Sequence, residues 1–558
     1  MIPITVSLKD LQSLIGEELG VNEILKLLAM TKCEIKHVKG DLIELMVPLD
    51  RPDLFSVEGV SRALRCIMGT YRKPIIDKNE KCICQVYVDS EVLDIRPYIA
   101  SAVIREVKLS CEALRQMTQL RRKLHETYCR GKLLASIEIH DYNLTTPPLT
   151  YSVKGEEDIT LKPRGEGRKL RLTDILRREP WKKHAYLLFG YNRLPVMVDS
   201  KGEVLSVPPI IESDETKITA NSSDILLIVT GINERVVEEA LEIVAANLLE
   251  RGGILKRVEI RYPDTLLITP KMEPREIIIE PQQVEKVLGV KIDLNKLMAL
   301  LVKSGFEVKS ENGKVKVGVP PYRADVIHEI DVIEDIGIVY GFDNIKGGPL
   351  SVLAPGKAYP MNKLAMRARR IMTALGFQEI ITCVLSDRKD LLNKMLLKEE
   401  KIIEVINPII RKYSAIRNWL MPKLLEFLSN NKHAPYPQKI FEIGEVALIC
   451  EGDEETGVKC TLKLAAAITD YKAGYGDIQA TLFALLENLQ IPFKLEPTYH
   501  PSFIRGRTAQ IRIHNSVVGI IGEIYPEVLE NFKLENPVAA FEMDLGKIAA
   551  CYPQESRK

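Results

Sequence analysis

The sequence predicts a multidomain α+β protein made of four modules, spanning residues 1–90, 91–272, 273–350 and 351–558. Its length predicts several domains, since 558 residues at about 150 residues per domain give three or four. In the first three modules, stretches with helical apolar spacing alternate with short strand-like runs, whereas the last has successive strands with few helices between them. Apolar and charged contents of 46% and 27% are typical of globular proteins and exclude a disordered or collagen-like chain.

The first module is predicted to be a small α/β unit. Residues 8–16 and 21–30 have helical apolar spacing, and residues 41–50 form a strand-like run that ends at a proline. After the following turn, Ser56 is a helix-cap candidate and Gly69 ends the next apolar stripe. We therefore expect a further helix between Ser56 and Gly69.

The second module is predicted to be a larger α/β block, with a helix over 111–128, a buried strand over 224–231 and a helix that Asn233 caps. Two of its segments are basic: residues 105–132 hold eight Lys and Arg against three Glu, and residues 162–183 hold nine against three acids. These segments either meet phosphates or form a solvated helix face and a loop.

The third module is predicted to be rich in helices, in the order strand, helix, helix, strand, strand, helix. A Gly- and Pro-rich stretch at 347–357 then reads as a linker. In the last module, successive strand-like runs predict a mostly antiparallel sheet with flanking helices. A hairpin is expected around Asn515-Ser516.

An acidic cluster in the third module is the sharpest chemical signal in the sequence. Residues 324–345 contain six acids and no Lys or Arg, and positions 331, 334 and 335 share one side of a predicted helix. The cluster consists of Asp325, Asp331, Glu334 and Asp335. Clustered carboxylates need a positive partner, either a hard cation such as Mg²⁺ or the basic surface of another molecule.

Several classes of protein are not indicated by the sequence. No apolar run approaches the roughly 18 to 20 residues that span a bilayer, and the N-terminus has no signal-peptide pattern. The ten cysteines form no CxxC pair, and neither a zinc motif, a P-loop, a GxGxxG loop nor a GxSxG elbow occurs. Ser206 and Thr230 lie at predicted strand ends, where polar groups often bind ligands. We expect a cytoplasmic protein with reduced thiols and no membrane contact.

Several stretches together resemble one known family. They are PLDRPDLFSVEGVSRAL, IRPYIASAVI, IEIHDYNL, VLSVPPII with the later TG, VPPYRADVIHEIDVIEDIGIVYGFDNI and APGKAYPMNKLAMRARRIMTALGFQE. Over nearly its whole length, the chain resembles the β subunits of phenylalanyl-tRNA synthetases (phenylalanine–tRNA ligases), in their shorter archaeal and eukaryotic form. The resemblance implies an α subunit as partner, in an α₂β₂ tetramer that uses ATP to attach phenylalanine to tRNA(Phe).

The resemblance implies that the last module has the fold of a class II synthetase without its chemistry. Such a site needs an arginine on a central strand and a second, late arginine, because the transition state carries negative charge on phosphorus. The strand that holds Phe441-Glu442 has no arginine, and neither does the stretch 537–545. We expect no catalytic residue for aminoacylation in this chain, and an active site on the α subunit.

The resemblance also assigns the acidic cluster and the second module. It implies that Asp325, Asp331, Glu334 and Asp335 bind a Mg²⁺ ion shared with the α subunit. It implies an editing-type domain that removes tyrosine mischarged onto tRNA. The candidate pocket residues are Arg121, Lys132, Ser206, Glu212, Val229, Thr230 and Gly231.

Two departures from the family pattern predict weakened or altered editing in a retained fold. Glu212 stands where the family commonly has Asn, and Val229 stands where it usually has a polar or acidic residue. Recognition of a tyrosine hydroxyl depends on paired polar groups, so losing one abolishes discrimination. The alternatives to a ligase subunit are a stand-alone aminoacyl-tRNA hydrolase and a non-catalytic scaffold that binds tRNA.

Overall fold

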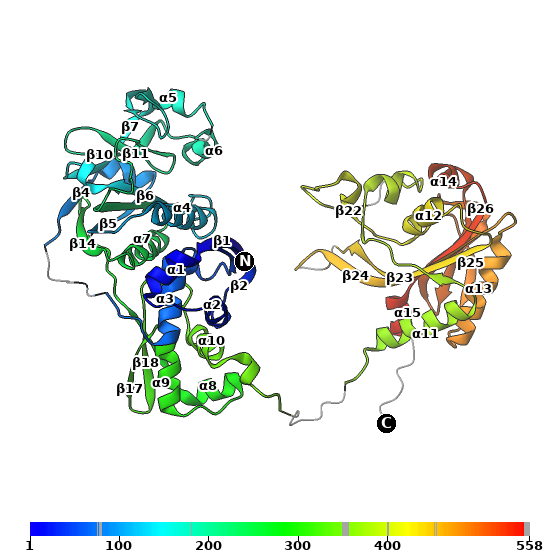
Figure 1. Cartoon of the computed structure of the whole chain (residues 1–558). Helices are drawn as coiled ribbons and strands as arrows, with labels where there is room; N and C mark the ends of the chain where they lie inside the picture. Colours follow the sequence, from blue (N-terminus) through cyan, green and yellow to red (C-terminus); the bar gives the residue numbers. More distant parts are fainter. Residues whose placement is uncertain are drawn as a thin grey trace. The chain divides into compact units, whose positions relative to one another are not determined.

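The computed structural model describes residues 1–74, 76, 81–179, 181–348, 356–398, 401–450, 452 and 455–551. The chain folds into two compact units, Met1–Pro349 and Leu350–Lys558 (Figure 1). Both contain helices and sheets, which confirms a mixed α/β, multidomain architecture. No helix among the described residues is long and apolar enough to cross a membrane.

The N-terminal part of the first unit is a three-stranded antiparallel sheet with three helices. Its strands lie in the order β1 (Ile2–Ser7), β3 (Leu42–Val47), β2 (Glu34–Lys39), and its helices are α1 (Leu8–Ile15), α2 (Val21–Leu28) and α3 (Val57–Met68). The predicted helix between Ser56 and Gly69 is confirmed, and Gly69 ends it in the left-handed conformation with φ of 77°. Ser56 does not cap the helix with its side chain; its hydroxyl instead accepts a hydrogen bond from Asn247 at 3.0 Å.

A large sheet forms the middle of the first unit. Its strands lie in the order β12, β11, β10, β7, β4, β14, β5, β13, β6, with β15 paired to β14. Their bounds are β4 Cys84–Val88, β5 Tyr98–Arg105, β6 Ala135–Asp141, β7 Leu149–Gly155, β10 Arg193–Val198, β11 Val204–Val207, β12 Ile211–Glu212, β13 Ile225–Gly231, β14 Ile254–Arg261 and β15 Leu266–Thr269. A two-stranded sheet, β8 (Thr160–Leu161) with β9 (Leu170–Arg171), and the short helices α5 (Leu172–Ile175) and α6 (Lys182–Ala185) lie in the segment between β7 and β10.

Two long helices pack on this sheet and continue its core into the N-terminal part. They are α4 (Cys111–Glu126) and α7 (Glu234–Leu249). Helix α7 lies between strands β5 and β13 on one side and helix α3 on the other (Figure 1). The apolar residues of these elements belong to one buried cluster that also contains the side chains of β1 and β3. The N-terminal part is therefore not an independent hydrophobic core.

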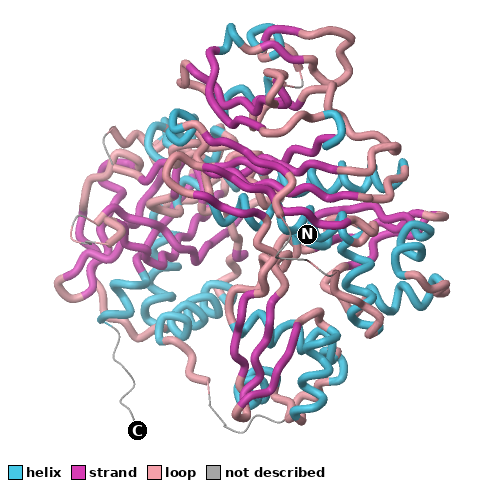
Figure 2. Tube along the Cα trace, turned by 90° about the vertical axis from the view of Figure 1, so that its left-hand side faces the viewer, coloured by secondary structure: helices cyan, strands magenta, loops and turns pink. Residues whose placement is uncertain are grey.

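The last part of the first unit is a second three-stranded sheet covered by helices. The strands lie in the order β16 (Arg275–Ile279), β18 (Lys314–Val319), β17 (Glu307–Glu311), and the helices are α8 (Pro281–Leu288), α9 (Leu294–Lys303) and α10 (Glu329–Tyr340). Figure 2 shows this sheet at the bottom of the view, with its helices on one side. The predicted order of strands and helices is confirmed.

The second unit is built on a seven-stranded sheet in which only the pairing of β19 with β23 is parallel. Its strands lie in the order β19 (Gln378–Glu379), β23 (Gln438–Ile449), β24 (Val458–Thr469), β28 (Val538–Asp544), β27 (Ser516–Ile524), β26 (Phe503–Ile513), β25 (Lys494–Pro497). Strands β26 and β27 form the predicted hairpin, and His514-Asn515 form its turn. The prediction of a mostly antiparallel sheet is therefore confirmed.

Two apolar layers cover this sheet. Helices α11 (Pro360–Ala374), α13 (Tyr475–Asn488) and α15 (Leu545–Cys551) pack with one buried cluster. Helices α12 (Met421–Asn430) and α14 (Pro526–Asn531) pack with another. A small sheet, in the order β20 (Leu385–Ser386), β22 (Ala415–Ile416), β21 (Ile403–Glu404), lies in the segment before α12.

One carboxylate in the first unit makes stability depend on pH. Burial, together with the charges of Glu238 and Glu239, raises the pKa of Glu242 to about 7, although its carboxylate accepts the backbone N–H of Met272. Because the pKa of Glu242 is higher in the folded state, the free energy of unfolding is highest below the ordinary pKa of a glutamate. It falls as the pH rises toward 7 and the buried carboxyl group ionises.

We expect Glu242→Gln, which keeps an acceptor for Met272, to raise stability at pH 8 by about 2 kcal/mol and to flatten its decline between pH 5 and 8. Urea unfolding across that range measures the effect. Glu234→Gln, at the exposed start of the same helix, is the control that leaves the decline unchanged. A decline of the same size in Glu242→Gln would show that other groups cause it.

Candidate functional site

The acidic cluster surrounds a buried arginine that sequence analysis missed. Arg323 donates to both oxygens of Asp325, at 2.9 and 2.8 Å, and to Asp335 at 2.5 Å. Its side chain is only 3% exposed. Arg323 immediately precedes the acidic stretch that begins at residue 324, so the count of charges over 324–345 left it out.

These ion pairs set the protonation states of the buried groups. Burial by itself would raise the pKa of Asp325, but the charge and hydrogen bonds of Arg323 outweigh burial and hold that pKa at about 2. Burial likewise opposes the charge on Arg323, and Asp335 and Asp325 raise its pKa well above the ordinary value. Asp325 and Arg323 are therefore both ionised over the physiological pH range.

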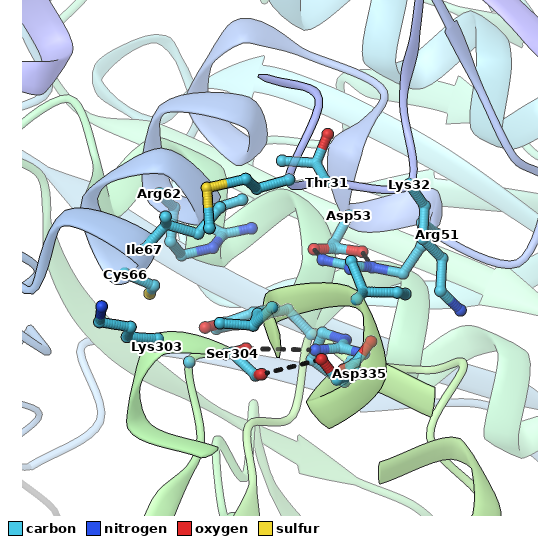
Figure 3. A pocket seen from close by; sticks show the side chains of 17 residues that line it. Thr31, Lys32, Arg51, Asp53, Arg62, Cys66, Ile67, Lys303, Ser304 and Asp335 are labelled. Carbon is cyan, nitrogen blue, oxygen red and sulfur yellow. Dashed lines mark hydrogen bonds and ion pairs between the residues drawn. The ribbon is translucent and has the colours of Figure 1, made fainter. Parts of the chain in front are cut away.

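A second arginine extends this network to the N-terminal part of the chain. Arg51 makes two hydrogen bonds of 2.9 Å with Asp53 and lies 3.9 Å from Asp325. Figure 3 shows Lys32, Arg51 and Asp53 above Asp335. The acidic segment therefore contacts the residues just before α3 through a buried ion pair.

The two remaining acidic residues have separate partners. Asp331 accepts the backbone N–H groups of Ile327 and His328, at 2.8 and 2.7 Å, and so caps the start of α10. Glu334, whose side chain is 53% exposed, pairs with Lys32 at 2.8 Å. The four predicted magnesium ligands thus do not converge, and among the described residues no three His, Cys, Asp or Glu side chains could hold a metal ion together.

The second candidate site is a cavity of about 730 Å³ beside α4, β6 and β12. Three of the seven predicted pocket residues line it: Arg121, Lys132 and Glu212. The two basic segments meet here, because Arg121 and Lys132 come from 105–132, whereas Arg164 and Lys183 come from 162–183. No pattern in the sequence indicates that the two basic segments meet, because their meeting depends on the fold of the segment between β7 and β10.

Glu212 is held between two arginines at the wall of this cavity. Arg121 donates to one carboxylate oxygen at 2.5 Å, and Arg164 donates to the other. Burial would raise the pKa of Glu212, but the charges of the two arginines lower it overall. The carboxylate is therefore ionised and both of its oxygens are occupied.

Positive charge dominates the rest of the cavity. Burial lowers the pKa of Lys132 to about 8, and its ammonium donates to the carbonyl of Pro209 at 3.0 Å. Burial and the charge of Lys132 lower the pKa of His184 to about 4 and that of His125 well below its ordinary value. Both imidazoles are consequently neutral at pH 7.

The other four predicted pocket residues do not line this cavity. Ser206 donates to Glu138 at 2.6 Å, and Glu138 itself lines the cavity. Thr230 accepts a hydrogen bond from the buried Arg96 at 3.1 Å, and Val229 is fully buried in the core. At Gly231 a Cβ atom would lie 2.2 Å from the carbonyl oxygen of Leu134, so close backbone packing requires glycine there.

In the second unit, internal ion pairs occupy the middle of the large sheet. Strands β23 and β28 carry no arginine. Arg417 reaches β23 from outside it, and pairs with the buried Glu442 at 2.7 Å. Lys463 of β24 pairs with Glu542 of β28 at 2.9 Å. No arginine of these central strands is available to bind a phosphate.

Replacing Arg323 tests whether it provides the charge that the acidic cluster needs. Arg323→Met leaves Asp335 buried without its cation and leaves Asp325 with only the more distant Arg51, which costs about 3–5 kcal/mol in urea unfolding. Arg115→Met, at an exposed pair with Glu112, is the control and changes stability by less than about 1 kcal/mol. Mg²⁺ should not restore the loss; full rescue by Mg²⁺ would show that the cluster is a preformed metal site.

Both units of the chain match known proteins. A family model described as the phenylalanyl tRNA synthetase beta chain CLM domain matches residues 349–545, and one described as the tRNA synthetase B5 domain matches residues 277–342. The chain is 37% identical to the phenylalanine–tRNA ligase beta subunit of Pyrococcus furiosus and 35% identical to that of Archaeoglobus fulgidus, each over 97% of this chain and 98% of the relative.

A solved structure agrees with these matches. The crystal structure of an N-terminal fragment of the phenylalanyl-tRNA synthetase beta subunit from Pyrococcus horikoshii is similar, with a TM-score of 0.58 and 31% identity. The similarity covers 61% of this chain and 99% of the fragment. On the extent and identity of these matches, the chain belongs to the family of phenylalanine–tRNA ligase beta subunits.

Proposed function

We propose that this chain joins an α subunit in an α₂β₂ phenylalanine–tRNA ligase, which uses ATP to attach phenylalanine to tRNA(Phe). The observation that carries the proposal is the match over 97% of this chain and 98% of the relatives, because it includes both units. A stand-alone hydrolase or a tRNA-binding scaffold would not require the class II-like second unit. The full-length match therefore favours the ligase subunit.

In this proposal the α subunit binds ATP and carries the chemistry. Amino-acid activation places negative charge on phosphorus, and preorganised cations must stabilise that charge. Here Arg417, which reaches the buried Glu442 of β23, is 2.7 Å from that carboxylate and donates to Thr382 as well. Its charge is thus neutralised internally, which supports a class II-like fold without catalytic activity.

An exposed apolar surface in the second unit supports the need for a partner. Ile381 and Ile406 are 92% and 93% exposed, and Ile409 is fully exposed. Large apolar side chains that are this exposed are candidate contacts for a partner, because leaving them in water is unfavourable. We call Ile381, Ile406 and Ile409 the isoleucine ridge and propose that the α subunit covers it.

The four predicted ligands of the shared magnesium ion differ in how free their carboxylates are to bind a metal. Asp325 and Asp335 are engaged with the buried Arg323, so they are poor candidates. Glu334 is largely exposed and Asp331 lies one turn before it on α10. We propose that Asp331 and Glu334 are the ligands this chain offers, to a site that the α subunit completes.

For the cavity of the second module, the proposal is contact with the acceptor end of tRNA but weakened editing. An aminoacyl ester carries a positive α-ammonium group, and the surrounding Arg121, Lys132 and Arg164 repel it. Glu212 cannot offset this charge, because both its oxygens are bound by arginines. The same positive charge favours the phosphates of an RNA strand.

The domain partition and compartment are also part of this proposal. We propose the same four modules but start the second before Cys84 rather than at residue 91, because β4 (Cys84–Val88) pairs with β14 and β7 of the large sheet. The nine cysteines whose side chains are described are all free thiols, which supports a reducing, cytoplasmic environment.

The first test is exchange of pyrophosphate into ATP, which reports phenylalanyl-adenylate formation. We expect no exchange from this chain alone and exchange when the α subunit is added. Ile406→Asp/Ile409→Asp should unfold like the wild type, because both residues are exposed, yet support little exchange. Lys459→Asp, a charge change on an exposed position of β24, is the control. Adenylate formed by the chain alone would refute the proposal.

The second test concerns editing. We expect the assembled enzyme to hydrolyse tyrosyl-tRNA and phenylalanyl-tRNA at rates within about threefold of each other, because Glu212 has both oxygens bound by arginines and Val229 is buried in the core, so neither selects the hydroxyl. Deacylation assays on both substrates measure this ratio. Rapid and selective hydrolysis of tyrosyl-tRNA that Lys132→Met abolishes would contradict it.

A further inference from the structure

Two arginines of helix α3 share a single carboxylate beneath the surface. Arg62 lies 3.5 Å from one oxygen of Glu250, and Arg65 pairs with the other oxygen. The side chains of Arg62 and Glu250 are only 2% and 4% exposed. The group therefore carries one uncompensated positive charge in a buried position.

The hydrogen bonds of this group are incomplete as well. Among the described residues, neither Nη2 of Arg62 nor Nε of Arg65 has a hydrogen-bond partner, although both atoms are buried. The ring of Tyr322 covers one face of the Arg62 guanidinium at 3.9 Å, but a ring face offers no acceptor for the in-plane N–H groups. A buried charge that lacks partners is strongly unfavourable, so an acceptor is needed here.

A small cavity of about 40 Å³ adjoins Arg62. Figure 3 shows Arg62 and Cys66 on α3 above Lys303 and Ser304. One water requires about 10–15 Å³ of such space, so the cavity admits an ion but not a nucleotide. Burial raises the pKa of Cys66 to about 11, so its thiol adds no negative charge.

The other charged side chains that line the cavity do not neutralise the positive charge of Arg62 and Arg65. The exposed side chain of Lys303 makes no hydrogen bond or ion pair with any described residue. The two lining carboxylates are committed elsewhere: Asp53 pairs with Arg51 and Asp335 pairs with Arg323. The side chain of Lys32 is engaged with Asp50 and Glu334. The unpaired charges are thus those of Arg62 with Arg65 and of Lys303.

We propose that this cavity binds a small inorganic anion, of halide to phosphate size, between Arg62 and Lys303. The anion accepts the free N–H of Arg62 and neutralises the arginine pair. Since Arg62 belongs to α3 and Lys303 ends α9, the bound anion links the N-terminal part of the first unit to the part that carries the acidic helix. This role is independent of aminoacylation.

Thermal unfolding of the full chain at constant ionic strength tests the site. Sodium chloride and sodium phosphate are compared with sodium gluconate, whose anion is too large for the cavity. We expect chloride or phosphate to raise the unfolding temperature saturably by about 1–3 °C relative to gluconate. Arg62→Met should abolish this response, and Arg115→Met should retain it. General salt effects on stability do not saturate and would affect all variants equally.

The outcomes separate the possible ligands. A response to chloride alone identifies a halide-sized site, and a response to phosphate identifies a wider one. Equal unfolding temperatures in all three salts would overturn the proposal, as would a saturable response that Arg62→Met keeps. Bromide-soaked wild-type crystals give an independent readout: an anomalous peak beside Nη2 of Arg62 supports the site, and a water at that position refutes it.

Discussion

The ion pairs of Arg323 are the contact on which the arrangement of the first unit depends. This guanidinium binds Asp325, which precedes α10, and Asp335, which lies within it, and it also donates to the carbonyl of Ser304 at the end of α9, so it fixes the acidic segment against α9. Through Asp325 it also approaches Arg51 and Asp53, next to α3. A buried ion pair of this kind contributes little net stability, but breaking it is costly, so it specifies one arrangement of the two parts.

An ion pair with an arginine likewise engages the acidic group at the other places where the sequence suggested chemistry. Glu212 is bound by Arg121 and Arg164 in the cavity of the second module. Glu442 is bound by Arg417 in the middle of the large sheet of the second unit. Charged groups that would serve as ligands, bases or phosphate clamps in an enzyme are engaged with each other here. This pattern is one ground for the proposal that the α subunit provides the chemistry.

Helices, strands and turns could be predicted well from the sequence, because residues close together in the chain determine them. Gly69 ends α3 because it adopts a left-handed conformation, and the helical spacing of residues 57–67 defines the buried face of that helix. The hairpin between β26 and β27 and the order of elements around α10 were predicted for the same reason.

The long-range contacts were harder to predict. The acidic stretch was interpreted without Arg323, which stands one residue before it, and without Lys32, which lies about 300 residues away along the chain. The two basic segments gave no sign that they share a cavity. Assigning β4 to the large sheet required its pairing with β14, which comes about 170 residues later. Periodicity carries no information on such contacts.

The central claim is that this chain is complete only with an α subunit. Native mass spectrometry of the two chains produced together tests it most directly, because it gives stoichiometry without relying on activity. The account predicts a complex with two copies of each chain, which dissociates when Ile406 and Ile409 are both replaced by Asp. A chain that stays alone in the presence of the α subunit, with its isoleucine ridge uncovered, would contradict it.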